Sequence, residues 1–300
     1  MLVFRSRSLT KALGLSWARF ILIGLVPLTT AVVSLPAAET LSAGELRGAA
    51  SAAIERGQYS NAVELATQAI AAEPDNFRAW AMRGRAYSLL KRPTMAIRDF
   101  TQSLKLDPTS TSLYQVRGEE YFRVGRFQES VADFDRYLEL APAQKPQHWQ
   151  RGISLYYAGE FAEGRKQFEL HQTVNAHDVE NAVWHFLCTT RESGLEKARA
   201  ALIPIEGDSR IPMSQVHALF AGKLKPQDVL DAARSGSPGP KELNNRLFYA
   251  HLYLGLYFEA IGDSKAAREH IYKAASEFNA DHYMGDVARS HAAVLRNRKD

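Results

Sequence analysis

Three prolines divide the first half of this 300-residue chain into equal intervals. Pro74, Pro108 and Pro142 are spaced 34 residues apart, and each closes a short acidic or apolar tail (AAEP, KLDP, ELAP). A fixed period of roughly 20 to 50 residues is typical of repeat architectures, in which each unit packs only against its neighbours. The period therefore predicts a stack of similar units, and it sets the register in which the rest of the chain is read.

Aligned on these prolines, units that begin at residues 43, 77 and 111 carry the same residue types at the same positions. These positions hold Trp80, Gly84, Tyr87, Ala96, Phe100 and Pro108 in the second unit, Tyr114, Gly118, Tyr121, Ser130, Phe134 and Pro142 in the third, and an alanine-rich set, Leu46, Ala50, Ala53, Ala62, Ala66 and Pro74, in the first. The pattern resembles the tetratricopeptide repeat (TPR), a pair of antiparallel helices that stacks on its neighbours. A fourth unit begins at Lys145 and keeps Gly152 and Phe168, but Ala176 replaces its closing proline.

The small residues of the pattern have a packing role. Gly84, Gly118 and Gly152 are expected to let the paired helices approach closely, while Phe100 and Phe134 fill the space between them. Gly57, Gly125 and Gly159 follow the first helix of a pair, where a positive φ reverses the chain. We therefore expect a helix, a glycine turn and a second helix in each of these units.

Beyond residue 176 the period fades, while helical patterns continue. Apolar residues from Val179 to Leu187 fall on one helix face, and shorter helices are predicted near 195–202, 214–220 and 227–233. Residues 247–275 return to the repeat pattern, and a last helix is predicted over 285–296. The sequence predicts an all-α fold: a right-handed α-solenoid of TPR helix pairs (41–176), an irregular helical connector (177–240) and a C-terminal TPR-like pair with a capping helix (241–300).

The first 38 residues have the composition of an export signal. Arg5, Arg7, Lys11 and Arg19 precede an apolar run over residues 20–38 that ends in small residues. This order is typical of a secretory signal, and the apolar core is short for a membrane span of about 20 residues. We expect a cleaved signal; an uncleaved anchor and a disordered leader are the alternatives.

The leader also explains the charge of the chain. Its four basic residues account for the whole net charge of +4, because the remainder has 33 basic and 33 acidic residues. The charge therefore gives no reason to expect nucleic acid binding, and membrane contact is expected only through an uncleaved leader. Cys188 is the single cysteine, which excludes an internal disulfide and leaves the leader without a cysteine for lipid attachment.

Stacked TPR units present the first helix of each pair on a concave groove, and fixed positions of that helix point into it. These positions hold Arg78 and Arg85 in the second unit, Gln115, Glu119 and Phe122 in the third, and Trp149, Ile153, Tyr156 and Tyr157 in the fourth. Aromatic and arginine side chains in one patch favour protein binding. The alternatives are that the aromatic residues, Tyr156 above all, fill seams between units, and that the two arginines lie on a solvated face.

Two more specific activities find little support in the sequence. The groove positions that hold a partner's terminal carboxylate in chaperone-binding TPR proteins carry Arg47, Ser51, Met82, Ser112 and Val116 here, so that clamp is not expected. The spacing of metalloprotease, nucleophile-elbow and phosphate-loop motifs is absent. His177 with Asp178, and Asp281 with His282 and Asp286, are weak candidates for metal binding, and Cys188 is expected to be a buried thiol. We expect no catalysis, no cofactor and no metal.

The run Arg151–Gly159 (RGISLYYAG) is similar to the fourth-repeat sequence of the NlpI family of bacterial envelope TPR proteins. The LFAGK segment at 219–223 and the FYAHLYLG segment at 248–255 extend the similarity over roughly residues 41–296. The resemblance implies a homodimeric, non-catalytic adaptor that docks peptidoglycan hydrolases or a protease. Members of that family carry a lipid on an N-terminal cysteine, and this chain has no cysteine there.

The sequence thus predicts an interaction scaffold of the bacterial periplasm or cell envelope, which binds a peptide or helix of a partner enzyme in the groove. Two alternatives remain: hydrolytic chemistry in the histidine-containing C-terminal half, and self-assembly of the chain into a homo-oligomer.

Overall fold

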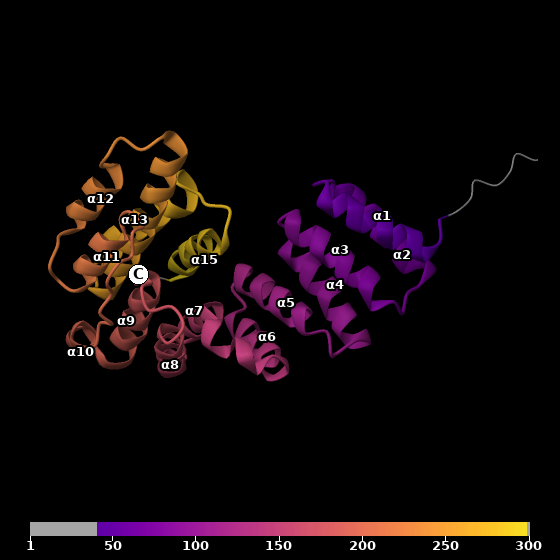
Figure 1. Cartoon of the computed structure of the whole chain (residues 1–300), viewed down its shortest axis with the longest axis horizontal. Helices are drawn as coiled ribbons and strands as arrows, with labels where there is room; N and C mark the ends of the chain where they lie inside the picture. The colour runs from indigo at the N-terminus through magenta and orange to yellow at the C-terminus, as the bar shows by residue number, and fades with distance from the viewer. Residues whose placement is uncertain (1–40, 299–300) are drawn as a thin grey trace, which may run out of the picture. The chain divides into compact units, whose positions relative to one another are not determined.

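A computed structural model describes residues 41–298, and Leu41–Asp300 form one compact unit. The predicted leader lies outside the described residues. Every regular element between residues 41 and 298 is a helix (Figure 1). The all-α prediction is therefore confirmed. No helix in this range combines the length and the apolar character that crossing a bilayer requires.

The four predicted repeats form four consecutive helix pairs. The pairs are α1 (Ala43–Glu55) with α2 (Tyr59–Ala72), α3 (Phe77–Leu89) with α4 (Pro93–Leu106), α5 (Thr111–Arg123) with α6 (Phe127–Leu140), and α7 (Trp149–Ala158) with α8 (Phe161–Gln172). Each second helix packs against its own partner and against the first helix of the next pair, as in a TPR solenoid. The fourth pair begins later than its predicted start at Lys145, because Pro142 and Pro146 hold a 3₁₀ helix, η1 (Pro142–Gln147), before it.

The glycines of the repeat lie where the helices approach most closely. A Cβ atom added to Gly84, Gly118 or Gly152 would lie 2.8, 2.7 or 2.6 Å from the ring of a phenylalanine on the second helix of the same pair, which is Phe100, Phe134 or Phe168. Contacts this short displace a rigid ring, so no larger residue fits without repacking. The predicted role of these glycines is confirmed, and their neighbour is the aromatic residue of the same repeat.

The turn between paired helices has a left-handed residue in all four repeats. Gly57, Gly125 and Gly159 have φ values of 72°, 75° and 85°, as predicted, and Lys91 takes the corresponding position in the second repeat with a φ of 56°. A lysine in this conformation is less favourable than glycine. The pairing of its ammonium group, described below, gives this lysine a separate role.

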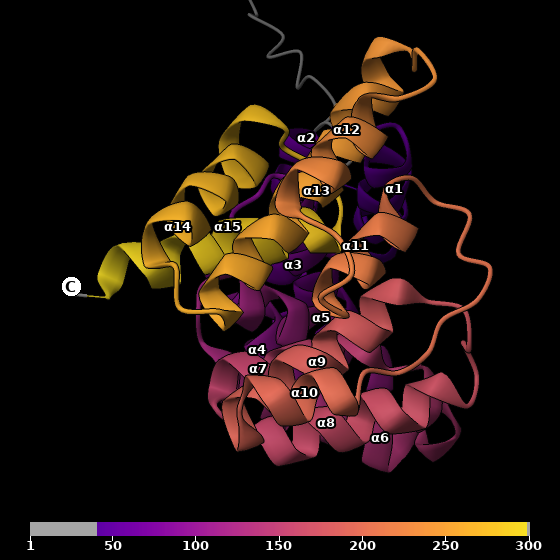
Figure 2. The same cartoon turned by 90° about the vertical axis from the view of Figure 1, so that its left-hand side faces the viewer.

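The C-terminal half continues the stack with less regular helices. They are α9 (Val179–Ser193), α10 (Leu195–Ala200), α11 (Met213–Phe220), α12 (Pro226–Arg234), α13 (Pro240–Ala260), α14 (Ser264–Tyr272), a short π-helix (Lys273–Glu277) and α15 (Tyr283–Asn297). Helix α11 packs against α9, α12 and α13 (Figure 2). In α13, an added Cβ on Gly255 would lie 2.5 Å from Ile271 of α14, so this pair repeats the close packing of the earlier ones.

The hydrophobic core is unevenly distributed along the chain. One cluster runs from Phe122 in α5 to Leu295 in α15, whereas the first three repeats contain smaller clusters built largely around alanine. Helix α15 joins the large cluster by packing against both α14 and α5. The last helix of the chain therefore returns to the TPR helices, and this contact shapes the candidate site.

Candidate functional site

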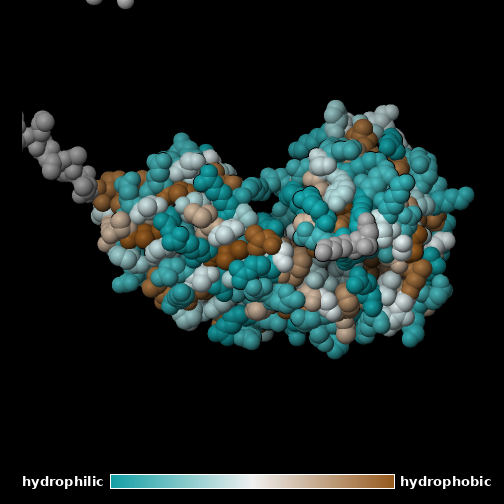
Figure 3. Space-filling model, turned by 180° about the vertical axis from the view of Figure 1, so that it is seen from behind, coloured by the Kyte–Doolittle hydropathy of each residue, from teal (hydrophilic) through white to brown (hydrophobic). Residues whose placement is uncertain are grey.

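The first helices of the pairs, α1, α3, α5 and α7, share a face that their second helices do not cover. We call this face the inner surface; its predicted binding positions run from Arg78 on α3 to Tyr157 on α7. Seen from behind, the surface of the described chain is hollowed between the N-terminal repeats and the C-terminal helices (Figure 3). On that view the surface is mostly hydrophilic, and its hydrophobic side chains gather in small, separate patches.

The part of the inner surface on α3 is open. Arg78 and Arg85 lie seven residues apart, about two helical turns, and both side chains are exposed. The guanidinium group of Arg78 lies 4.7 Å from the centroid of the Phe77 ring. Neither arginine has an ion pair with another residue in the described range. Two positive charges are therefore presented to solvent on one face of α3.

Polar side chains connect α5 to α7 next to this open part. The Gln115 amide donates to Glu119 at 3.0 Å, and its carbonyl oxygen lies 2.6 Å from Nε2 of His148. Gln150 reaches the same Glu119 oxygen at 3.4 Å. Burial raises the pKa of Glu119 and lowers that of His148 to about 4. Gln115 and Glu119 are thus half-buried and bonded to each other, at the edge of the open part.

Helix α15 covers the aromatic part of the inner surface. The Tyr283 ring stacks on Phe122 with a centroid distance of 5.3 Å and meets Trp149 edge-on at 5.1 Å. The Ser290 hydroxyl donates to the Phe122 carbonyl at 3.3 Å. Phe122 is consequently buried, with 0% of its surface exposed. Ile153 and Tyr156 are also buried, at 1% and 6%, and Tyr156 packs on Phe161 and Trp184 at centroid distances of 5.6 and 5.5 Å. This corrects the expectation of a free aromatic groove, because the chain's own last helix occupies it.

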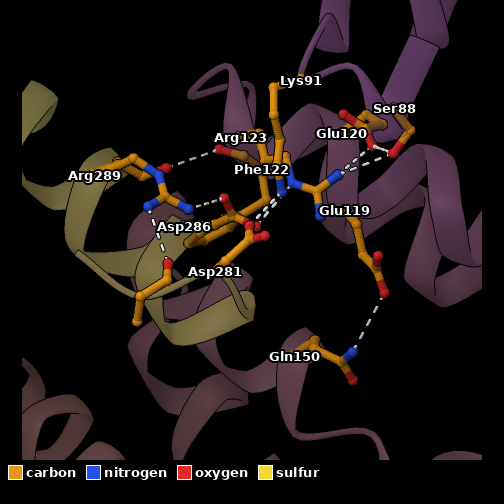
Figure 4. A network of polar contacts seen from close by, with 12 residues as sticks. Ser88, Lys91, Glu119, Glu120, Phe122, Arg123, Gln150, Asp281, Asp286 and Arg289 are labelled. Carbon is orange, nitrogen blue, oxygen red and sulfur yellow. Dashed lines mark hydrogen bonds and ion pairs between the residues drawn. The ribbon is translucent and has the colours of Figure 1, made fainter. Parts of the chain in front are cut away.

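An ionic network holds α15 to α5 and to the turn after α3 (Figure 4). Asp286 accepts from Arg123 at 2.8 Å and from Arg289 at 2.6 Å. Asp281, just before α15, pairs with Lys91 at 2.7 Å. Arg123 also pairs with Glu120, a buried carboxylate whose pKa burial raises and which accepts from Ser88. The pairing of Lys91 gives a reason for a lysine at a turn position that favours glycine.

The fourth repeat makes a further contact with the C-terminal helices. The Tyr157 hydroxyl lies 2.8 Å from Nδ1 of His291 on α15, and Nε2 of the same ring lies 2.9 Å from Glu259 on α13. Tyr157 is half-buried, and burial raises its pKa.

The nine predicted residues of the inner surface differ in their exposure. Arg78 and Arg85 are exposed; Gln115, Glu119, Trp149 and Tyr157 are partly buried; and Phe122, Ile153 and Tyr156 lie in the core. Their assignment to a partner remains a prediction.

Two sequence profiles described as tetratricopeptide repeats match the chain, one over residues 47–111 and the other over residues 111–144. Residues 47–144 are tetratricopeptide repeats. Such repeats mediate protein–protein interaction through the extended surface that their stacking creates. Neither matching profile is that of an enzyme family.

Solved structures similar to this chain include several of MamA. MamA from Desulfovibrio magneticus RS-1 is 14% identical, with a TM-score of 0.49 and coverage of 67% of this chain and 100% of that chain. A crystal structure of the MamA protein is 15% identical, with a TM-score of 0.49 and coverage of 66% and 98%. The first TPR of Spaghetti (RPAP3), bound to an HSP90 peptide, is 29% identical, with a TM-score of 0.33 and coverage of 34% and 80%. None of the curated proteins compared with the sequence matches it.

Sequence reasoning overlooked one recurring feature of the TPR units. An arginine precedes the packing glycine in three repeats, and in two of them it forms a double hydrogen bond with an aspartate on the second helix of its own pair. Arg83 bonds Asp99 at 2.6 and 2.9 Å, and Arg117 bonds Asp133 at 2.7 Å through each nitrogen. Arg151 pairs instead with Asp135 at 2.5 Å. The Arg-Gly dipeptide recurs at the same position of these three repeats. This recurrence could have predicted the arginine–aspartate hydrogen bonds between helices.

The candidate metal and nucleophile residues form no catalytic arrangement in the described range. No three His, Cys, Asp or Glu side chains between residues 41 and 298 gather as a metal site requires. The Asp178 side chain caps α9 by accepting from the Glu180 amide at 3.0 Å. Cys188 is fully buried, and burial raises its pKa. A buried thiol held in its neutral form is a poor nucleophile.

Proposed function

We propose that this chain is a non-catalytic scaffold that holds a segment of a partner protein on the open part of its inner surface. The observation that carries the proposal is the pair of exposed arginines on α3, Arg78 and Arg85, next to a face that α15 closes only farther along. Exposed arginine is enriched at protein interfaces, and its guanidinium group bonds carboxylates through two nitrogens. Acidic groups of the partner are therefore placed against α3.

The closed part of the inner surface limits where the partner lies. Phe122 is buried under α15 and Tyr156 against Phe161 and Trp184, so both serve as packing residues. The partner segment therefore runs along α3 and the exposed side of α5. Trp149 remains partly exposed at the end of this path. The partner segment is thus expected to contact the two arginines of α3 at one end and the fourth repeat at the other.

We also propose that the partner is an enzyme of the bacterial cell envelope, such as a peptidoglycan hydrolase or a protease. This part of the proposal rests on the resemblance of RGISLYYAG and the later segments to the NlpI family, and on the export signal expected in residues 1–38. N-terminal sequencing of the protein purified from its native cells, together with fractionation, tests export. An unprocessed chain in the cytoplasm would contradict it.

A charge-reversal pair tests the binding surface. Three tagged proteins are used to capture partners from native envelope extracts: the wild-type chain, the double variant Arg78→Glu/Arg85→Glu, and Arg98→Glu. The captured proteins are quantified by mass spectrometry. Arg98 is an exposed arginine of α4, the second helix of the same repeat, and serves as the matched control. The double variant is expected to lose at least about tenfold of the specific partner, because each charged contact contributes roughly 1.5–3 kcal/mol.

Equal capture by all three proteins would contradict the proposed surface. Loss in the control variant alone would move the site to the α4 side of the repeat. Light scattering of the same samples separates self-assembly from partner binding, because a chain that only self-assembles gives a concentration-dependent mass and captures further copies of itself.

A further inference from the structure

A cavity lies at the far end of the inner surface, where the fourth repeat meets the C-terminal helices. It has a volume of about 400 Å³, and its walls come from α7, α8, α9, α13 and the start of α15. This volume is within the range of roughly 300–1,000 Å³ that is typical of ligand pockets. Five phenylalanine, tyrosine and tryptophan side chains line it: Trp149, Phe168, Trp184, Tyr249 and Tyr283. The faces of such rings attract cations as well as apolar groups.

One end of the pocket is acidic. Asp178 and Glu180 both line it, and both pair with Arg210 at 2.7 Å. Asp208 pairs with the same guanidinium group at 2.7 Å, so three carboxylates share one arginine. Burial, followed by the charge of Asp178, raises the pKa of Glu180. Even with Glu180 shifted toward its neutral form, Asp178 and Asp208 set two negative charges against the single charge of Arg210, so a second cation beside Asp178 would be stabilised.

Two buried side chains in the pocket wall, Asn181 and Trp184, have a polar atom with no hydrogen-bond partner, as does the hydroxyl of the partly buried Tyr283. Asn181 uses both amide hydrogens, on the Phe168 carbonyl at 3.1 Å and on Gln172 at 3.0 Å, but its side-chain oxygen accepts none. The indole N–H of Trp184 likewise donates to no atom. Both residues are at least nine-tenths buried, with 2% and 1% exposed. Leaving such groups unpaired is unfavourable, and a bound molecule that pairs them recovers that free energy.

The unpaired atoms also indicate what the occupant contains. The Asn181 oxygen requires an N–H donor and the Trp184 indole requires an acceptor. Asp178 already accepts from Arg210, Asn175 and the Glu180 amide, so it offers a cation its charge rather than an unused acceptor. Asp178 and Glu180 lie at the start of α9, so a cation is favoured on that side of the pocket. The Trp184 indole fixes where the acceptor lies. A peptide with a basic side chain supplies both, through its backbone carbonyl groups and its cationic end.

We infer that this pocket binds a lysine or arginine side chain, together with its adjoining backbone, from a polypeptide partner. The inference rests on the proposed function, since only a chain that holds polypeptides offers a peptide to this pocket. The basic group lies against Asp178 between the aromatic walls, and a backbone carbonyl accepts from Trp184. The partner would then carry acidic groups for α3 and a basic residue for the pocket.

Calorimetric titration of the full chain tests this inference with defined peptides. The probe is acetyl-Gly-Gly-Arg-Gly-Gly-amide, and the control replaces arginine with citrulline, which has nearly the same shape and no charge. We expect the arginine peptide to bind and the citrulline peptide to bind at least about tenfold more weakly, as expected for loss of a charge-assisted hydrogen bond. Asp178→Asn should weaken arginine binding by a similar factor, and Asp231→Asn, which changes an exposed carboxylate of α12 outside the pocket wall, should not change it.

Asparagine is as good an N-cap as aspartate, so Asp178→Asn keeps the start of α9. If that variant nevertheless fails to fold, the arginine–citrulline comparison on the wild-type chain decides. Absence of binding, equal affinity for both peptides, or full affinity in a folded Asp178→Asn variant would overturn the inference and leave a pocket that holds water. The Arg78→Glu/Arg85→Glu variant should bind the peptide normally. A failed peptide titration would therefore overturn the pocket inference without contradicting the binding surface proposed on α3.

Discussion

Gly118 shows how strictly a single residue sets the distance between two helices. An added methyl group would lie 2.7 Å from the Phe134 ring, which is itself fully buried. We expect Gly118→Ala to lower the free energy of unfolding by about 1–3 kcal/mol, because overpacking outweighs the better helix propensity of alanine. Urea denaturation measures the change.

The matched control for this substitution is Gly48→Ala. Gly48 lies within α1 and has no atom within 4 Å of an added Cβ, so the variant should gain up to about 1 kcal/mol from helix propensity alone. If both variants changed stability in the same direction, the close packing at Gly118 would not be the cause.

His148 predicts an acid-sensitive step at the junction of α5 and α7. Its Nδ1 accepts from the Arg151 amide at 3.2 Å and caps α7, so the proton is on Nε2, next to Gln115. Burial lowers its pKa from the ordinary 6.5 to about 4. The unfolded chain therefore takes up a proton below pH 6.5 that the folded chain refuses until about pH 4, and the free energy of unfolding falls over that interval.

The variant His148→Gln tests this pH dependence. Glutamine keeps a polar side chain but does not titrate, so the loss of stability between pH 6.5 and 4 should be smaller than in the wild type, although His251, whose pKa burial also lowers to about 4, still contributes. Urea midpoints measured across this range give the slope. An unchanged slope in His148→Gln would exclude this histidine as a source.

Among the elements, the paired helices were predictable and the position of α15 was not. Each repeat is a local arrangement: Gly84 meets Phe100 on the next helix of the chain, and the repeat period records that contact. The contact between Phe122 and Tyr283 joins residues far apart in the chain. A helical pattern indicates which side chains face inward, but not which distant element covers them. The groove prediction therefore named residues of α3, α5 and α7 without indicating that α15 covers part of them.

Tyr283 is the residue through which α15 closes the aromatic part of the inner surface. We expect Tyr283→Ala to lower the free energy of unfolding by about 2–4 kcal/mol, since it removes the ring packed on Phe122 and Trp149. Hydrogen exchange should accelerate in α15 and in the last turn of α5, while α1 and α2 keep their rates as an internal control. Equal acceleration throughout the chain would mean that α15 is not a separate closing element.

At the scale of the whole molecule, the chain divides its inner surface into three parts. Arg78 and Arg85 present charge on an open face, α15 fills the aromatic face, and the pocket near Asp178 lies beyond it. In a solenoid, stability comes from contacts between neighbouring units, so the side chains of an open face are free to vary with the partner. The sequence could place Arg78 and Arg85 on this face of α3 because TPR geometry fixes which positions of the helix point there. The pocket depends on contacts between α9, α13 and α15 that no repeat pattern encodes.

Site-specific photocrosslinking tests the central claim most directly. A benzophenone amino acid replaces Arg85 in one protein and Arg98 in another, and both are irradiated in native envelope extracts. We expect a discrete crosslinked partner at position 85 on α3, mapped by mass spectrometry to an acidic segment, and none at position 98 on α4. The same partner at both positions, or a crosslink at position 98 alone, would contradict this claim.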